Sequence, residues 1–150
     1  MQNQDFSITF LVEQTPDEVF KAIINVRDWW SEEIEGNSEN LNDEFIYHFG
    51  NLHYSKHKII EVVQGTKVVW LTIDSKLTFV NKQDEWSGTK MKFEISKLED
   101  ITKLVITHSG LVPELECYDA CSAGWTYYLL NSLLPLIKTG IGNPDQKQKI

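Results

Sequence analysis

The stretch from Asn42 to Val112 is a succession of strand patterns joined by short turn signals. Short connections favour antiparallel hairpins, because parallel pairing of successive strands needs a long crossover. Residue pairs such as Gly50-Asn51 and Glu99-Asp100 mark the turns. The strands that this pattern predicts are Glu44–Phe49, Leu52–Val63, Thr66–Ser75, Leu77–Val80, Thr89–Leu98 and Thr102–Gly110.

A further strand and a helix precede this region. Apolar residues alternate with mostly polar ones from Phe6 to Val12, which is the period of a half-buried strand. The sequence Thr15-Pro16-Asp17-Glu18 then combines an N-cap threonine, a proline at the first helical position and the glutamate of a capping box. We expect this helix to end near Asn25 and a second short helical turn to carry Trp29-Trp30.

The last third of the chain changes to a helical period. We predict one long helix from Tyr118 to Thr139, with Gly140 as its C-cap and a bend rather than a break at Pro135. On a wheel of about 100° per residue, the wide apolar face holds Trp125, Tyr127, Leu129, Leu130, Leu133, Leu134, Leu136 and Ile137. The opposite side holds Ala120, Cys121, Gly124, Asn131 and Pro135.

These elements predict an α+β fold. A curved antiparallel sheet must cover one face, and the long C-terminal α-helix is broad and apolar enough to do so. We therefore expect about six or seven strands wrapped on that helix, with two short helices after the first strand. The length of 150 residues is typical of one domain, so we assign residues 1–150 to a single domain.

Charge excludes some classes of partner. The net charge is −8, and residues 1–50 hold eleven acidic residues against Lys21 and Arg27. A strongly basic footprint for nucleic acid is therefore missing, and we predict no nucleic-acid partner. No run of apolar residues is long enough to span a bilayer, and the first residues lack the pattern of a secretory signal, so we expect no membrane insertion and a cytoplasmic location.

The order of these elements resembles the helix-grip fold of the START/SRPBCC superfamily. Within it, the sequence is most similar to homologues of the C-terminal domain of the heat-shock protein 90 ATPase activator. The motifs that carry the resemblance extend over nearly the whole chain. They are Thr15-Pro16-Asp17-Glu18-Val19-Phe20, Trp29-Trp30, Asp84-Glu85-Trp86-Ser87-Gly88-Thr89, Thr107-His108-Ser109-Gly110-Leu111-Val112-Pro113, Glu116-Cys117-Tyr118, Gly124-Trp125, Ser132-Leu133 and Thr139-Gly140-Ile141-Gly142-Asn143-Pro144.

The resemblance implies a range of functions. The superfamily includes lipid carriers, hormone receptors, cyclases and chaperone cofactors, and a fold by itself does not select among them. A long helix across a curved sheet leaves space that side chains fill or a ligand occupies. Our candidate cavity residues are Tyr47, Trp70, Phe93, His108, Tyr128 and Asn131. The alternative interpretation is that the aromatic residues among them are ordinary core.

His108 is the one histidine that we expect to point toward the helix, because it shares strand parity with Leu104 and Ile106. Together with Cys117, Cys121 and Glu116 it suggests a mixed zinc site. The alternative is a hydrogen-bonded core histidine beside two buried thiols, and we favour it, because no Cys-x-x-Cys knuckle is present. We predict no metal and no cofactor.

Three functional hypotheses follow. The first is a non-enzymatic module that binds an unidentified small hydrophobic molecule between the sheet and the C-terminal helix. The second is an interaction with a chaperone, through the acidic stretch from Asp28 to Glu44 that carries Trp29 and Trp30. The third is a cavity enzyme with His108 as its acid or base.

Overall fold

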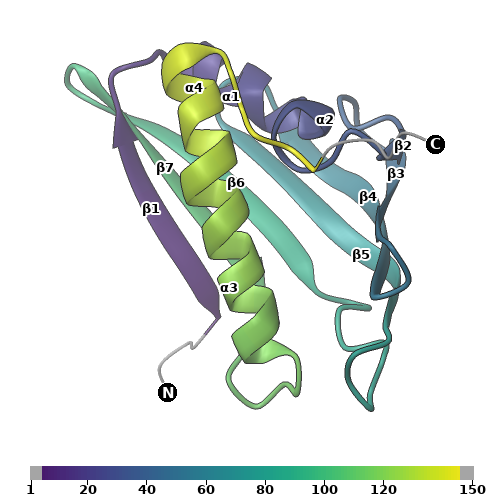
Figure 1. Ribbon diagram of the computed structural model, residues 1–150. Coiled ribbons are helices and arrows are strands. Elements are labelled where there is room, and N and C mark those ends of the chain that lie inside the picture. The colour runs from purple at the N-terminus through teal and green to yellow at the C-terminus, as the bar shows by residue number, and fades with distance from the viewer. Residues whose placement is uncertain (1–4, 146–150) are drawn as a thin grey trace.

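The computed structural model describes residues 5–145, which form a seven-stranded antiparallel sheet and a set of helices on one of its faces (Figure 1). The strand order is β1-β7-β6-β5-β4-β3-β2, and every neighbouring pair is antiparallel. The strands are β1 (Phe6–Val12), β2 (Glu35–Gly36), β3 (Glu44–Phe49), β4 (His53–Val63), β5 (Lys67–Leu77), β6 (Lys90–Leu98) and β7 (Ile101–Ser109). The helices are α1 (Pro16–Ile24), α2 (Val26–Trp29), α3 (Tyr118–Tyr128) and α4 (Leu134–Thr139), with a π-helical segment (Leu129–Leu133) between the last two.

This architecture confirms the predicted α+β helix-grip fold. The strand bounds agree closely with the alternation of apolar residues, and β1 and β3 begin and end at the predicted residues. The strand predicted for Leu77–Val80 is wrong. Leu77 ends β5, and the backbone N–H of Thr78 donates to the carbonyl of Leu52 rather than to a strand partner, at 3.0 Å. The two-residue strand β2 was not predicted, because it is too short to show alternation.

The two short helices after β1 form as the sequence predicts. The Thr15 hydroxyl accepts from the N–H of Glu18 at 3.2 Å, and the Glu18 carboxylate accepts from the N–H of Thr15 at 3.1 Å. This capping box satisfies two backbone donors at the start of α1 and fixes its first turn. The buried side of α1 then rests against β5 and β6 through Val19, Phe20 and Ile23.

The C-terminal helix contains a feature that the sequence analysis missed. The buried residues Cys121, Trp125, Leu129, Leu133 and Ile137 are spaced by four. On an α-helix this spacing turns by about 40° at each step, so the stripe would rotate away from the sheet. The N–H of Leu134 bonds instead to the carbonyl of Leu129, and this wider turn takes up the rotation.

The π-helical segment explains two errors of the uniform wheel. Ala120, Cys121 and Gly124 were placed on the less apolar side, but Cys121 is buried against the sheet, and Tyr127 and Leu130 of the predicted apolar face are exposed. A helical wheel that assumes the same rotation at every residue, aligned on the leucine-rich second half of the helix, places residues of the first half on the wrong side. Pro135 lies at the start of α4 and does not end the helix.

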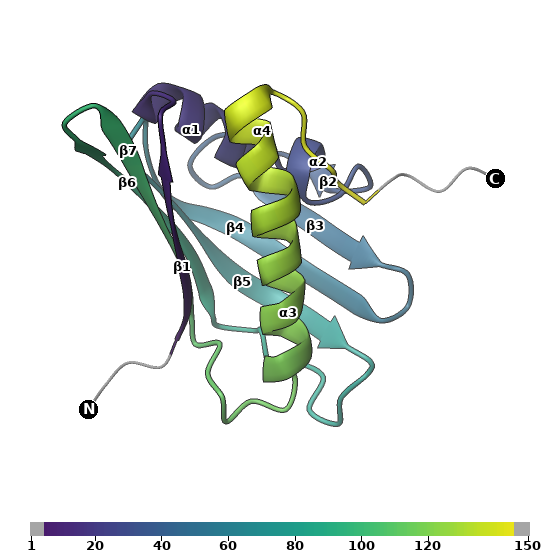
Figure 2. The same ribbon diagram turned by 60° about the vertical axis from the view of Figure 1, so that its left-hand side comes forward.

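Two layers enclose the core. The C-terminal helix crosses the concave face of the twisted sheet, and α1 and α2 close the space at one end (Figure 2). The side chains between these layers include the largest fully buried ones, among them Trp29, Trp30, Trp70, Phe45 and Phe93. Within residues 5–145, no helix is both long and apolar enough to cross a membrane.

Residues 140–145 form a strap that returns from the end of α4 to α2. The Ser132 hydroxyl donates to the carbonyl of Trp29 at 2.6 Å and accepts from the N–H of Asn143 at 2.7 Å. The N–H of Asp145 donates to the carbonyl of Trp30 at 3.0 Å, and the N–H of Glu32 donates to the carbonyl of Asp145 at 2.9 Å. The strap is therefore tied to the fold by its backbone.

We predict that Gly142→Ala destabilises the protein. A Cβ atom on Gly142 would lie 2.2 Å from the backbone carbonyl oxygen of Asp28, which is too close for a real contact. We expect the free energy of unfolding in urea to fall by about 1–3 kcal/mol. The matched control is Gly124→Ala, since a Cβ there meets nothing within 4 Å and a helix favours alanine over glycine. Equal stability of the two variants would contradict the close packing of the strap.

Candidate functional site

A pocket of about 360 Å³ lies between the sheet and the first half of the C-terminal helix. Its walls come from the residue that follows α2, from β3 and β4 and the loop between them, from the loop after β5, and from α3. The lining residues are Trp30, Tyr47, Phe49, Leu52, His53, Phe79, Trp86, Ala120, Cys121, Gly124, Trp125 and Tyr128. Aromatic and aliphatic carbon dominates this surface, which is typical of a site for a small organic molecule.

The inner wall of the pocket includes three tryptophans, Trp30, Trp86 and Trp125, which belong to a larger connected cluster. Trp30 stacks on Trp70 at 5.7 Å between ring centroids, and Trp29 stacks on both. Trp30 also contacts Trp125 at 4.9 Å, and Trp125 stacks on Trp86 at 5.6 Å. All five tryptophans of the chain belong to this cluster. Such a wall is rigid, because each indole is held between others.

The mouth of the pocket carries exposed apolar side chains. Phe49, Leu52 and Phe79 are between 43% and 50% exposed, although all three are large and apolar. The loops that hold them are linked, since the Thr78 hydroxyl donates to the carbonyl of Asn51 at 2.6 Å. Exposed apolar groups gathered at the opening of a cavity are a feature of ligand entry sites and interaction surfaces.

Two tyrosines bring a polar cluster to the pocket wall. The hydroxyl oxygens of Tyr47 and Tyr128 lie 3.0 Å apart. The Tyr128 hydroxyl donates to Oδ2 of Asp145 at 2.5 Å, and the Tyr47 hydroxyl lies 3.4 Å from the same oxygen. Burial raises the pKa of both tyrosines well above the ordinary value, so both hydroxyls keep their protons.

A second polar chain runs from the pocket wall into the sheet. Nε2 of His53 lies 3.1 Å from the Ser55 hydroxyl, and Nε2 of His57 lies 2.8 Å from the same hydroxyl. Nδ1 of His57 is in turn 3.1 Å from the Thr72 hydroxyl. Burial lowers the pKa of His53 to about 3 and the pKa of His57 well below its ordinary value. Both imidazoles are therefore neutral near pH 7.

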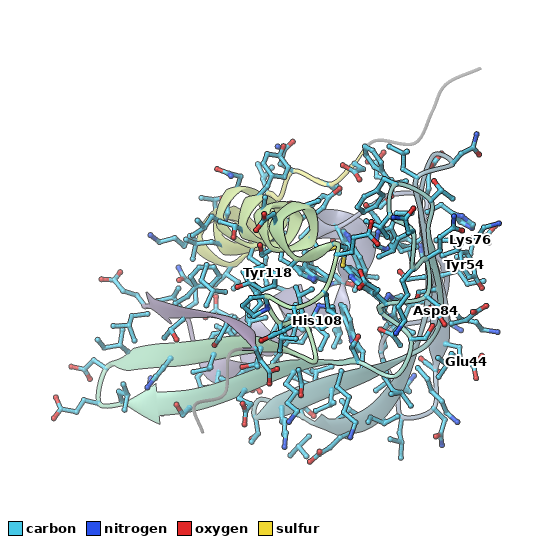
Figure 3. All side chains as sticks on the ribbon, turned by 90° about the horizontal axis from the view of Figure 1, so that it is seen from below. Glu44, Tyr54, Lys76, Asp84, His108 and Tyr118 are labelled. Carbon is cyan, nitrogen blue, oxygen red and sulfur yellow. The ribbon has the colours of Figure 1, made fainter. Side chains whose placement is uncertain are left out.

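His108 is a hydrogen-bonded core histidine and does not line the pocket. Its Nδ1 accepts from Nε1–H of Trp125 at 2.9 Å, and its Nε2 lies 2.8 Å from the Thr89 hydroxyl. That hydroxyl donates to the carbonyl of Trp86 at 2.6 Å, so Nε2 of His108 carries the proton. Burial lowers the pKa of His108 to about 3. Figure 3 shows His108 between the helix and the sheet, whereas Tyr54 and Lys76 point outward.

The two cysteines are free thiols at the start of α3. Sγ of Cys121 accepts from Nε1–H of Trp86 at 3.3 Å and faces the pocket, whereas Cys117 is fully buried. The hydrogen bond between the thiols raises the pKa of Cys117 and lowers that of Cys121. The Glu85 carboxylate caps this helix end by accepting from the N–H of Cys117 at 2.9 Å.

Glu116 does not join the cysteines and His108 in a metal site. Its carboxylate accepts from the backbone N–H of Asn81 at 3.0 Å and from that of Lys82 at 3.3 Å, so it anchors the loop after β5. No group of three or more potential metal ligands occurs in the part of the chain that the structure describes. The geometry therefore assigns these residues to hydrogen bonds within the fold.

The six candidate cavity residues separate into three groups. Tyr47 and Tyr128 line the pocket. Trp70, Phe93 and His108 are buried in the core without lining it, and Nε1 of Trp70 has no hydrogen-bond partner within residues 5–145. Asn131 is exposed, which contradicts the expectation that it points inward. Its neighbours Leu129, Ser132 and Leu133 occupy the side of the helix that faces the sheet.

The sequence analysis missed most of the pocket wall. The six candidates left out Trp30, Trp86 and Trp125, and the strand pattern did not reveal that the end of β3 and the loop after β5 bring Phe49 and Phe79 to the mouth. Cys121 and Gly124 were hidden by the uniform helical wheel. A sequence signal existed only for Gly124, because a glycine inside a helical pattern usually has a packing or functional reason.

The acidic stretch from Asp28 to Glu44 lies at the surface, but its tryptophans do not. Trp29 and Trp30 are 0% and 1% exposed, so neither is available to a protein partner. The side chains that remain at the surface include Asp28, Glu32, Glu35, Glu39 and Glu44. A protein partner that binds this stretch would therefore contact carboxylates but neither tryptophan.

We predict that acid destabilises the folded protein through its buried histidines. Histidines of the unfolded chain titrate near pH 6.5, but His53 and His108 do so near pH 3 when folded. Between these values the unfolded chain binds more protons, so the histidines' contribution to stability is complete above pH 6.5 and is lost as the pH falls. We expect a slope of about 1.4 kcal/mol per pH unit for each histidine in urea unfolding.

The His108→Gln variant tests the origin of this slope. Its amide can accept from Trp125 and donate to Thr89, but it does not titrate. We expect lower stability than the wild type at pH 7 and a shallower decline toward pH 4. A variant with the same slope as the wild type would show that His108 is not a cause.

Comparison with known proteins supports the fold. No protein-family model matches the sequence, and no curated protein matches it either. Solved structures do match, including the Aha1 dimer from Colwellia psychrerythraea, with a TM-score of 0.73 and 19% identity over 92% of this chain and 98% of that one.

Two other solved structures are also similar to this chain. DynU16, from the dynemicin biosynthetic locus, has a TM-score of 0.67 and 14% identity over 98% of this chain, which spans only 52% of DynU16. CalU16 from Micromonospora echinospora has a TM-score of 0.61 and 16% identity over 87% of this chain and 73% of that one. These findings agree with the resemblance that the sequence motifs indicated, and the chain has the helix-grip fold that these structures share.

Proposed function

We propose that this protein binds a small, largely apolar molecule in the pocket between the sheet and the C-terminal helix. The observation that carries the proposal is the pocket itself, with a volume of about 360 Å³ and walls of tryptophan, tyrosine and phenylalanine. This volume lies within the range of natural small-molecule sites. The stacked indoles favour a flat aromatic or polycyclic ligand over a flexible chain.

Two further features support binding rather than catalysis. His108, our only candidate acid or base from the sequence, lies outside the pocket with both ring nitrogens in hydrogen bonds. The histidine that does line the pocket, His53, is neutral near pH 7, because burial lowers its pKa to about 3. An acid with so low a pKa is almost wholly deprotonated at neutral pH and is a poor proton donor there.

We predict that the neutral dye N-phenyl-1-naphthylamine binds in the pocket with an increase in its fluorescence. Gly124→Leu should fill the pocket without disturbing the core, because a Cβ at this position meets nothing within 4 Å. We expect this variant to weaken dye binding at least tenfold. The titration also reports on the pocket wall, because the bound dye should quench the fluorescence of Trp30, Trp86 and Trp125.

The matched control is Ala123→Leu. Ala123 is exposed and adjacent in sequence, so this variant adds the same side chain outside the pocket. It should bind the dye as the wild type does. If wild-type protein fails to bind the dye, or if Gly124→Leu binds it equally well, the pocket is not a binding site. Native mass spectrometry of gently purified protein would then identify any natural occupant by its mass.

A second candidate function is interaction with a chaperone through the acidic surface between Asp28 and Glu44. The observation that favours it is the row of exposed carboxylates, including those of Glu32 and Glu35, on a chain whose resemblance includes chaperone activators. Charged surfaces of this kind accelerate association with a basic partner and lose that effect at high salt.

We predict that this interaction is sensitive to salt and requires the carboxylates. The Glu32→Gln, Glu33→Gln, Glu35→Gln triple variant should weaken binding to a bacterial heat-shock protein 90 at low ionic strength, measured by calorimetry. Unchanged affinity for the chaperone, or no binding by the wild type, would remove this candidate. The pocket variant Gly124→Leu serves as the control and should not affect it.

A further inference from the structure

In the polar cluster of Tyr47, Tyr128 and Asp145, hydrogen-bond acceptors outnumber donors. Three oxygens meet there, namely the two hydroxyls and Oδ2 of Asp145, at distances of 3.0, 2.5 and 3.4 Å. An ionised carboxylate only accepts, so two hydroxyl protons serve three oxygen–oxygen contacts. The indole N–H of Trp30 is a further donor to the Tyr47 oxygen. Whichever way the Tyr47 hydroxyl donates, the Tyr128 oxygen and the carboxylate keep unfilled acceptor positions, and neither hydroxyl has a proton left to donate.

The position of this carboxylate is fixed by the backbone of the strap. The N–H and the carbonyl of Asp145 bond to Trp30 and Glu32, and Asp145 forms a parallel bridge with Ser31. Trp30 itself lines the pocket and stacks on Tyr47 at 4.2 Å. The cluster is therefore preorganised, and a ligand need not order it.

No lysine or arginine within residues 5–145 forms an ion pair with Asp145; the ion pairs there are Lys56–Glu44 and Lys67–Glu61. Among the described residues, its carboxylate accepts hydrogen bonds from the hydroxyls of Tyr47 and Tyr128, two residues that line the pocket. A donor group of a ligand would therefore meet tyrosine oxygens whose protons are directed toward a negative charge. A carbonyl or ether oxygen at the same place would face only lone pairs.

We propose that the ligand of this pocket carries one hydrogen-bond donor, an O–H or N–H on an otherwise apolar aromatic body, and that Tyr47, Tyr128 and Asp145 select it against ligands that can only accept. This inference rests on the proposed binding function and defines its ligand class. The apolar walls contact the body of the molecule. The cluster orients the ligand and selects one whose polar end carries a hydrogen-bond donor.

The experiment compares two probes of similar shape, 2-naphthol and 2-methoxynaphthalene. Each probe is titrated into protein that holds N-phenyl-1-naphthylamine, and the loss of dye fluorescence gives the dissociation constant of the probe. The dissociation constant of the dye itself is measured first for each variant. Naphthol can donate a proton, whereas its methyl ether can only accept. We expect naphthol to bind about tenfold more tightly, as one additional hydrogen bond to a tyrosine oxygen polarised by the neighbouring carboxylate implies.

The Asp145→Asn variant tests the cause of this preference. An amide of the same size supplies protons to the tyrosine oxygens, and the strap keeps its backbone hydrogen bonds. We expect the preference for naphthol to fall to about twofold or less. Tyr54→Phe is the matched control, because it removes a hydroxyl on the outer face of the sheet (Figure 3) and should leave the preference unchanged. Urea unfolding establishes that both variants are folded.

The outcomes separate the inference from the function on which it rests. If the dye and both probes bind but naphthol has no advantage, the donor class is wrong and the binding function stands. If the preference persists in Asp145→Asn, the cluster is not its source and the inference is likewise overturned. If neither the dye nor the probes bind, both the inference and the proposed function fail.

Discussion

The contacts of Trp30 with five other aromatic rings organise this structure. Trp30 directly follows α2, Tyr47 and Trp70 come from the sheet, and Trp125 comes from the C-terminal helix. One side chain therefore joins the three parts of the fold, and it also forms the inner wall of the pocket. A cavity can persist beside this cluster because the indoles are fixed by one another and cannot easily collapse into the space.

The π-helical segment is the second condition for the pocket. A stripe of buried residues at a spacing of four would turn away from the sheet along an unbroken α-helix. The wider turn at Leu129–Leu133 keeps Trp125 and Ile137 on the sheet side of one helix. It thereby holds Cys121, Gly124 and Tyr128 at the pocket while the second half of the helix packs on the core. π-helical turns are frequent at functional sites, which agrees with this role.

Polar groups in the interior are used in two ways. His57 and His108 are enclosed and engaged at both ring nitrogens, so they link strands and helix without being available to a ligand. Tyr47 and Tyr128 lie at the pocket and share one carboxylate, which leaves acceptor capacity unfilled. The two sets of polar groups therefore differ in whether any hydrogen-bond acceptor is left unfilled at the cavity wall.

Local sequence patterns predict most of the secondary structure and the layer arrangement, because these follow from periodicity and capping; the short strand β2 and the π-helical segment are the elements they miss. The alternation from Phe6 to Val12, the capping box of Thr15 and Glu18 and the glycine cap at Gly140 each act within a few residues. The site, in contrast, depends on tertiary packing. Asn131 faces outward, Gly124 faces the pocket and Asp145 reaches Tyr47 across 98 residues of sequence. These placements depend on the phase of one helix and the path of the strap, which packing between distant segments sets and no local pattern encodes.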